Sequence, residues 1–217
     1  MRRLTIAICS AVLLSFGAAL PVHAQEARLV GRLADPARGQ VDEMLDAARA
    51  EHLPVEPLVD KALEGVFKGA RPELIVNAVR RLLEELRTAR VAFGTTATDA
   101  EVTAGASALR AGATRTDLAK LHALRPRQPL TVPAGVLADL VAAGVAADKG
   151  IAAVLALASN AGDADYIAFR RNVERDIALG ASPASSIAAR LRAVAPTAAD
   201  GESFTGSGTT IKRKIKP

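Results

Sequence analysis

Apolar residues recur at spacings of three and four along most of the chain, which is the pattern of helices that bury one face. The clearest example is the segment 72–93, where Arg80 and Arg81 each precede a glutamate by four residues on the side away from the apolar positions. Its apolar positions are Ile75, Val79, Leu82, Leu86, Ala89 and Phe93. We predict one long helix here, with a buried seam and a charged, solvated face.

Turn and capping residues divide the rest of the chain into helices, about eight to nine in all. The expected ranges are 36–51, 56–68, 72–93, 98–112, 116–124, 134–143, 147–159, 164–179 and 183–194. In the second helix, two apolar rows should be buried, formed by Leu58, Ala62 and Val66 and by Val59, Leu63 and Phe67. Alanine is abundant and alternating strand patterns are scarce, so the fold class is all-α.

Four polar residues precede predicted helices and are expected to cap them: Asp35, Thr98, Asp163 and Ser182. Asp35 and Ser182 each come before a proline, a residue favoured at the first helical position. Thr98 lies three residues before Glu101, the spacing of a capping box. These residues therefore set the predicted helix starts.

Four turns share a glycine, then a small or aliphatic residue, then an aliphatic residue six or seven positions after the glycine. The glycines are Gly69, Gly112, Gly144 and Gly180, and a fifth turn at His52 has the same layout without a glycine. A helix ends most readily on a residue with positive φ, which glycine adopts without strain. The repeat predicts stacked helical hairpins, as either an irregular solenoid-like array or a helical bundle.

The N-terminal 24 residues have the three parts of a secretory signal peptide. Arg2 and Arg3 precede an apolar run, and Val22 and Ala24 provide the small residues of a cleavage site. A membrane anchor is the competing interpretation, but the run is at the short end of what spans a bilayer. We expect cleavage before Gln25, giving a soluble mature chain in the periplasm or outside the cell, without any cysteine.

The net charge of +5 arises at the ends of the chain. Besides Arg2 and Arg3, four basic residues crowd the last six positions: Lys212, Arg213, Lys214 and Lys216. The remainder is nearly neutral and has no Trp and one Tyr, which argues against nucleic acid as a partner. The basic residues follow a flexible Gly/Ser/Thr tether, so we expect either contact with an anionic envelope surface or plain disorder.

The composition offers little for catalysis, and we predict no catalytic residues, metal ligands or cofactor. His52 and Glu56 face each other across a proline turn, but a histidine at a helix C-terminus more often interacts with the helix dipole. Arg170, Arg171 and Arg175 could bind an anion, although nearby acids favour a self-paired surface.

The sequence therefore predicts an exported binding or structural module with an unknown protein or peptide partner. The alternative is a cell-envelope enzyme, or an enzyme accessory, whose carboxylates converge only in the fold. The expected organisation is a signal peptide (1–24), N-terminal helical hairpins (25–124), a Pro-rich linker within the domain (125–133), C-terminal helical hairpins (134–195) and a flexible basic tail (196–217).

Overall fold

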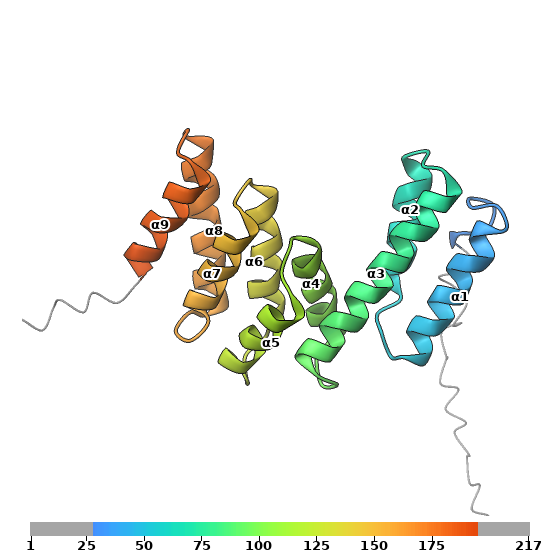
Figure 1. Cartoon of the computed structure of the whole chain (residues 1–217), viewed down its shortest axis with the longest axis horizontal. Helices are drawn as coiled ribbons and strands as arrows, with labels where there is room; N and C mark the ends of the chain where they lie inside the picture. Colours follow the sequence, from blue (N-terminus) through green and yellow to red (C-terminus); the bar gives the residue numbers. More distant parts are fainter. Residues whose placement is uncertain (1–27, 195–217) are drawn as a thin grey trace, which may run out of the picture. The chain divides into compact units, whose positions relative to one another are not determined.

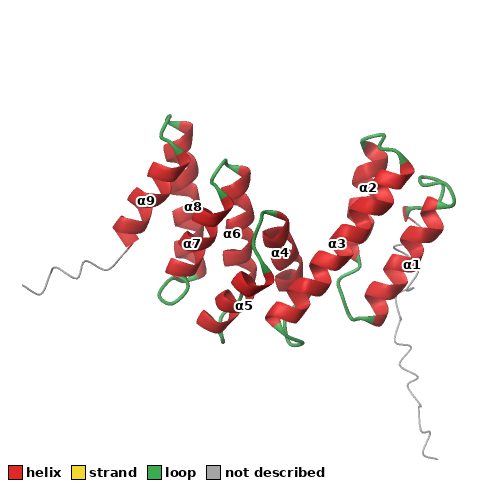
Figure 2. Cartoon of the chain, in the orientation of Figure 1, coloured by secondary structure: helices red, strands yellow, loops and turns green. Residues whose placement is uncertain are grey.

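The computed structural model describes residues 28–194, and over this range the chain is helical with no strand (Figures 1 and 2). The nine helices found there are α1 (Ala37–Ala50), α2 (Glu56–Phe67), α3 (Pro72–Phe93), α4 (Asp99–Arg110), α5 (Arg115–Leu124), α6 (Thr131–Ala142), α7 (Ala147–Leu157), α8 (Asp163–Ala178) and α9 (Pro183–Val194). The predicted all-α class is confirmed. None of these helices is long and apolar enough to cross a bilayer. The predicted signal peptide and the basic tail lie outside the described residues.

The chain divides into two compact units, and the division between Glu84 and Glu85 falls inside α3. The first unit holds α1, α2 and the first part of α3. Its core includes Leu45 of α1 together with Leu58 and Val59 of α2, all fully buried. Gly65 lets α2 approach α3 closely, since a Cβ there would lie 2.7 Å from Cγ1 of Ile75. These contacts give the first unit a core of its own.

The second unit, residues 85–194, is built as two rows of helices. Helix α6 packs on both α4 and α8, while α7 packs on both α5 and α9. The two rows are joined where α6 contacts α7 and α8 contacts α9 (Figure 1). Each helix therefore packs on the helix two positions along the chain, which is the arrangement of an α-solenoid. The prediction of stacked helical hairpins is confirmed in its solenoid-like form for this unit.

The five predicted turns share one hydrogen-bonded geometry. The φ angles are 64° at Gly69, 106° at Gly112, 92° at Gly144, 96° at Gly180 and 53° at His52. At each of them the N–H donates to the carbonyl three residues back at 2.9–3.1 Å, and the next N–H donates to the carbonyl five residues before it at 2.8–3.0 Å. This is the Schellman arrangement of helix C-termini. His52 thus adopts the left-handed conformation that glycine provides in the other four.

The predicted caps are partly confirmed. The Thr98 hydroxyl accepts a hydrogen bond from Glu101 N at 3.2 Å, and the Ser182 hydroxyl accepts one from Ser185 N at 3.2 Å. The prediction for Asp35 was wrong, because Pro36 occupies the N-cap position of α1 and no side chain caps that helix. Asp163 was also misplaced: it is the first residue of α8, whose N-cap is Gly162.

The predicted buried faces are confirmed except at the ends of the two α2 rows, where Val66 is half-buried and Phe67 is exposed. All six apolar positions of the α3 seam are buried. In α2, however, Phe67 is 77% exposed, and the Arg32 guanidinium lies 5.7 Å from its ring centroid. Helix α2 ends at Phe67, so the row that begins at Val59 has no neighbour to cover its last member. Helix α6 also begins earlier than predicted, with Pro133 inside its first turn.

Candidate functional site

A hollow of about 260 Å³ opens in the second unit between the α3–α4 turn and the α5–α6 loop. The α3–α4 turn supplies Thr96 and Ala97, while Pro126, Arg127, Gln128 and Pro129 come from the loop. The helices around it contribute Phe93, Glu101 and His122, and the remaining lining residues are Arg125 and Leu130. The wall therefore combines an aromatic ring and two prolines with several side chains that form hydrogen bonds.

Glu101 holds the α5–α6 loop in place. One of its carboxylate oxygens accepts a hydrogen bond from Leu130 N at 2.9 Å, and the other accepts from the backbone N–H and the hydroxyl of Thr98, at 2.8 Å and 3.0 Å. Burial opposes ionisation of this carboxyl, but those hydrogen bonds and the nearby His122 together lower the pKa of Glu101. The capping residue of α4 thus fixes the start of α6 as well.

Arg125 is the buried anchor of the site, with a relative exposure of 1%. It immediately follows α5, and its guanidinium reaches the turn before α8. Nη1 donates to the carbonyl of Ala161 at 2.6 Å, and Nη2 forms an ion pair with Asp163 at 3.1 Å. Nη2 also lies 3.5 Å from the carbonyl of Pro129, whereas the buried Nε has no hydrogen-bond partner in the described part of the chain. One side chain therefore connects two turns that are far apart in the sequence.

Tyr166 packs beneath Arg125. It is fully buried, its ring centroid lies 5.2 Å from the Arg125 guanidinium carbon, and its hydroxyl donates to the carbonyl of Val154 at 2.9 Å. Burial raises the pKa of Tyr166 to about 12, even though the positive charge of Arg125 opposes the rise. The tyrosine consequently remains a neutral hydrogen-bond donor at physiological pH and supports the anchor.

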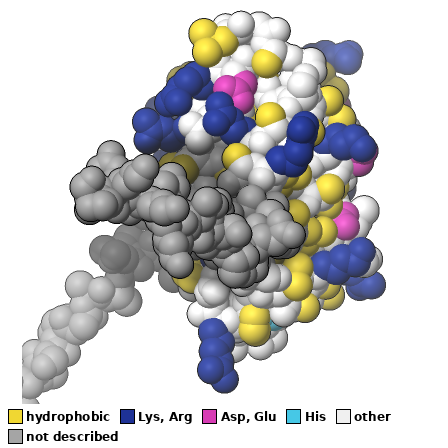
Figure 3. All heavy atoms as spheres, turned by 90° about the vertical axis from the view of Figure 1, so that its left-hand side faces the viewer, with side chains coloured by type: hydrophobic (Ala, Val, Ile, Leu, Met, Phe, Trp, Pro, Cys, Tyr) yellow, Lys and Arg dark blue, Asp and Glu magenta, His cyan; other side chains and the backbone are white. Residues whose placement is uncertain are grey.

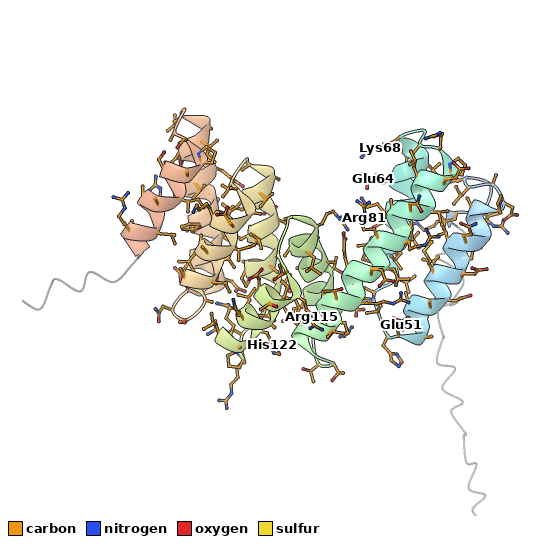
Figure 4. The ribbon with its side chains drawn as sticks, in the orientation of Figure 1. Glu51, Glu64, Lys68, Arg81, Arg115 and His122 are labelled. Atoms are coloured by element: carbon orange, nitrogen blue, oxygen red, sulfur yellow. The ribbon has the colours of Figure 1, made fainter. Side chains whose placement is uncertain are left out.

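Several side chains around the mouth of the hollow form no hydrogen bond with other described residues. Thr96, Arg127 and Gln128 are exposed, and none of their side chains forms a hydrogen bond within residues 28–194. His122 lies on α5 (Figure 4), and its ring makes a T-shaped contact with that of Phe93 at a centroid distance of 6.4 Å. Its imidazole also makes no hydrogen bond to other described residues. These groups are available to bind a ligand.

The arrangement is suited to binding rather than to proton transfer. The Glu101 carboxylate is committed to three donors of the fold. At the mouth, the guanidinium of Arg127 offers only donors, while Gln128, Thr96 and His122 can each donate as well as accept. Among the described residues, no cluster of three or more His, Cys, Asp or Glu could hold a metal ion. The hollow can therefore accept a group that presents oxygen atoms.

The structure does not gather the other candidates into one site. Glu56 forms an ion pair with Arg28, which also binds Asp60 at 3.0 Å. Arg170 pairs with Asp139 of α6 at 2.5 Å and with Glu174 at 3.7 Å, as expected for a self-paired surface. The predicted surface contacts at Lys212, Arg213, Lys214 and Lys216 lie beyond the last described residue.

Sequence reasoning missed both Arg125, the buried anchor, and Tyr166, which packs against it. Arg125 lies in the Pro-rich stretch beside the exposed Arg127, and nothing in the local pattern separates the two. Tyr166 had a usable signal, because it begins a row with Phe169 and Val173 at the spacing of a buried helical face.

Comparisons with models of known protein families, with curated proteins and with solved structures found no match to this chain.

Proposed function

We propose that this chain is an exported, non-catalytic helical scaffold that binds a segment of a protein or peptide. The observation that carries the proposal is the hollow beside Arg125, where a buried anchor lies next to hydrogen-bonding side chains that have no partner within residues 28–194. A binding site needs this combination, because groups held in place by the fold lose little freedom when a ligand arrives.

The size of the hollow favours part of a larger ligand. Pockets for drug-sized molecules usually measure about 300–1,000 Å³, and this hollow measures about 260 Å³. The exposed Pro126 and Pro129 offer apolar contact beside it. Stacked hairpins commonly present such sites on an extended surface.

Selection from a random peptide library with free C-termini tests this proposal, using the chain from Gln25 to Pro217. We expect enrichment of a common motif, and loss of binding when Thr96→Trp fills the hollow. Thr95→Trp is the matched control, because Thr95 is an exposed neighbour in the same turn that does not line the hollow. Failure to enrich any motif, or equal binding by both variants, would contradict the proposal.

Export is the second part of the proposal, and it rests on the sequence pattern of residues 1–24. Expression of the whole chain in a bacterial host should give a product that begins at Gln25 and is recovered from the periplasm or the medium. Mass spectrometry of the purified protein measures this directly. A product that keeps Met1 and stays in the cytoplasm contradicts export.

The basic C-terminal residues support a further contact with an anionic envelope surface. Residues 85–194 carry 13 Lys and Arg against 10 Asp and Glu, and Lys and Arg side chains are more prominent than Asp and Glu on the face shown in Figure 3. Each added positive charge contributes about 1 kcal/mol at most on an anionic membrane, so this binding should be sensitive to salt. Deleting residues 209–217 should abolish binding to phosphatidylglycerol vesicles, whereas deleting 201–208 should preserve it. Equal binding of the vesicles by the two deletion variants would show that residues 209–217 are not the membrane contact.

A further inference from the structure

We infer that the hollow beside Arg125 recognises the carboxylate at the C-terminal end of its peptide ligand. This inference rests on the proposed peptide-binding function and names the chemical group that the site selects. It rests on which donors and acceptors in the hollow are hydrogen-bonded to other described residues and which are not.

The strongest acceptor of the hollow is already hydrogen-bonded to described residues. Glu101 supplies the carboxylate that lines it, and this group accepts from Leu130 N, Thr98 N and the Thr98 hydroxyl. These three donors also stabilise its negative charge, as the lowered pKa of Glu101 indicates. A ligand that brings N–H donors, such as a peptide amide, therefore finds its best acceptor occupied.

The donor capacity of the hollow is largely unused. Arg127 has a full guanidinium with no ion-pair partner among the described residues, and Gln128 and Thr96 add an amide and a hydroxyl. Within residues 28–194, the buried Nε of Arg125 also lacks an acceptor. A buried donor without a partner is costly, so such groups commonly mark a place where an acceptor binds.

A carboxylate matches this set of donors better than any other group of a peptide. Its two oxygens accept several hydrogen bonds at once, and bonds to a charged guanidinium are about twice as strong as neutral ones. Arg125 is paired with Asp163, so Arg127 is the arginine that remains, among the described residues lining the hollow, to neutralise the incoming charge. The position of Arg127 on a proline-flanked loop limits the freedom that it loses on binding.

The experiment compares N-acetyl-trialanine carrying a free carboxylate with the same peptide carrying a C-terminal amide. Binding is followed by amide chemical shifts in two-dimensional NMR of the chain from Gln25 to Pro217. The free acid should shift the signals of Thr96, Glu101, Arg127 and Gln128 in a saturable manner. Its affinity should exceed that of the amide by about tenfold, the effect of one charged hydrogen bond.

Two arginine variants separate a specific contact from a general charge effect. Arg127→Gln should weaken binding of the acid by about threefold to tenfold and leave amide binding unchanged. Arg115→Gln removes an exposed arginine at the start of α5 that does not line the hollow, and it should change neither affinity (Figure 4). The same spectra report whether each variant remains folded.

Three results overturn the inference. Equal shifts by acid and amide would show that the carboxylate is not recognised, while the proposed peptide binding would survive. No shift by the acid up to its solubility limit would show that a chain end does not bind here. Acetate as effective as the peptide acid would reassign the site to small carboxylates. The proposed function fails separately, through the absence of a motif in the library selection.

Discussion

Both compact units carry ion pairs at the surface, but among the described residues the second unit also buries a paired arginine. In the first unit, ion pairs lie at the surface: Glu64 binds Lys61 and Lys68, and these contacts lower the pKa of Glu64 to about 2 while all three side chains stay in contact with water. In the second unit, Arg125 is buried and paired with Asp163, which is itself 39% exposed. Exposed pairs contribute little because water and salt screen them, whereas breaking a buried pair leaves a charge without a partner.

The largest expected effect comes from removing the buried anchor. Arg125→Leu should destabilise the second unit by about 2–4 kcal/mol, since it removes a buried, paired charge and the contact with Tyr166. Hydrogen exchange should show the loss in residues 85–194, with protection in 28–84 retained. As the matched surface change, Glu64→Gln should cost less than about 0.5 kcal/mol. Equal losses of stability from the two variants would show that the buried ion pair of the second unit contributes no more than the exposed pair of the first.

A smaller effect is expected at the shared turns. An alanine at Gly112 must adopt a φ of 106° and would place its Cβ 2.9 Å from Cβ of Ala147, while Gly180 has no heavy atom within 4 Å of that position. Gly180→Ala should therefore cost about 1–2 kcal/mol for the backbone alone, and Gly112→Ala about 1 kcal/mol more for crowding. Urea unfolding measures both, and equal costs would show that backbone conformation is the whole effect.

The third prediction concerns the stability of the chain at low pH. Because the pKa of Glu101 is lower in the folded chain than its ordinary value of 4.5, its stabilisation is present above pH 4.5 and is lost as pH falls through the folded pKa. Glu101→Gln should cost about 1 kcal/mol at neutral pH and progressively less in acid. Urea unfolding at several pH values checks this, with Asp117→Asn as the comparison, since Asp117 caps α5 but does not hold the α5–α6 loop. A cost that is independent of pH would contradict the assignment.

The smallest effect is expected at His52, which occupies the glycine position of the first unit with a φ of 53°. Replacing it with glycine removes the strain of the left-handed conformation but gives the unfolded chain more freedom. The two effects nearly cancel, so His52→Gly should change stability by less than about 1 kcal/mol. Thermal unfolding measures it. A large loss of stability would mean that contacts of the imidazole stabilise the chain more than the change in backbone strain at the turn does.

The fold followed from local patterns, and the candidate site did not. Spacing along 72–93 and the glycine turns predicted the helices, because caps and buried faces depend on residues within one or two turns of each other. The site depends on Arg125 reaching Ala161 and Asp163, which lie 36 and 38 positions away in the sequence. Such distances in sequence leave no periodic signal. Phe67 shows the same limit, since burial of the last residue of a helix depends on what lies beyond it.

The two rows of helices in the second unit also bear on how the chain reaches its native state. Because α6 packs on α4 and α8, and α7 on α5 and α9, each packing partner lies one hairpin away along the chain. Ordering can begin at any hairpin and spread to its neighbours, without a search for distant segments. If the chain is exported one end first, as proposed above, it can then acquire structure in the order in which it emerges, with no need to wait for its last residue.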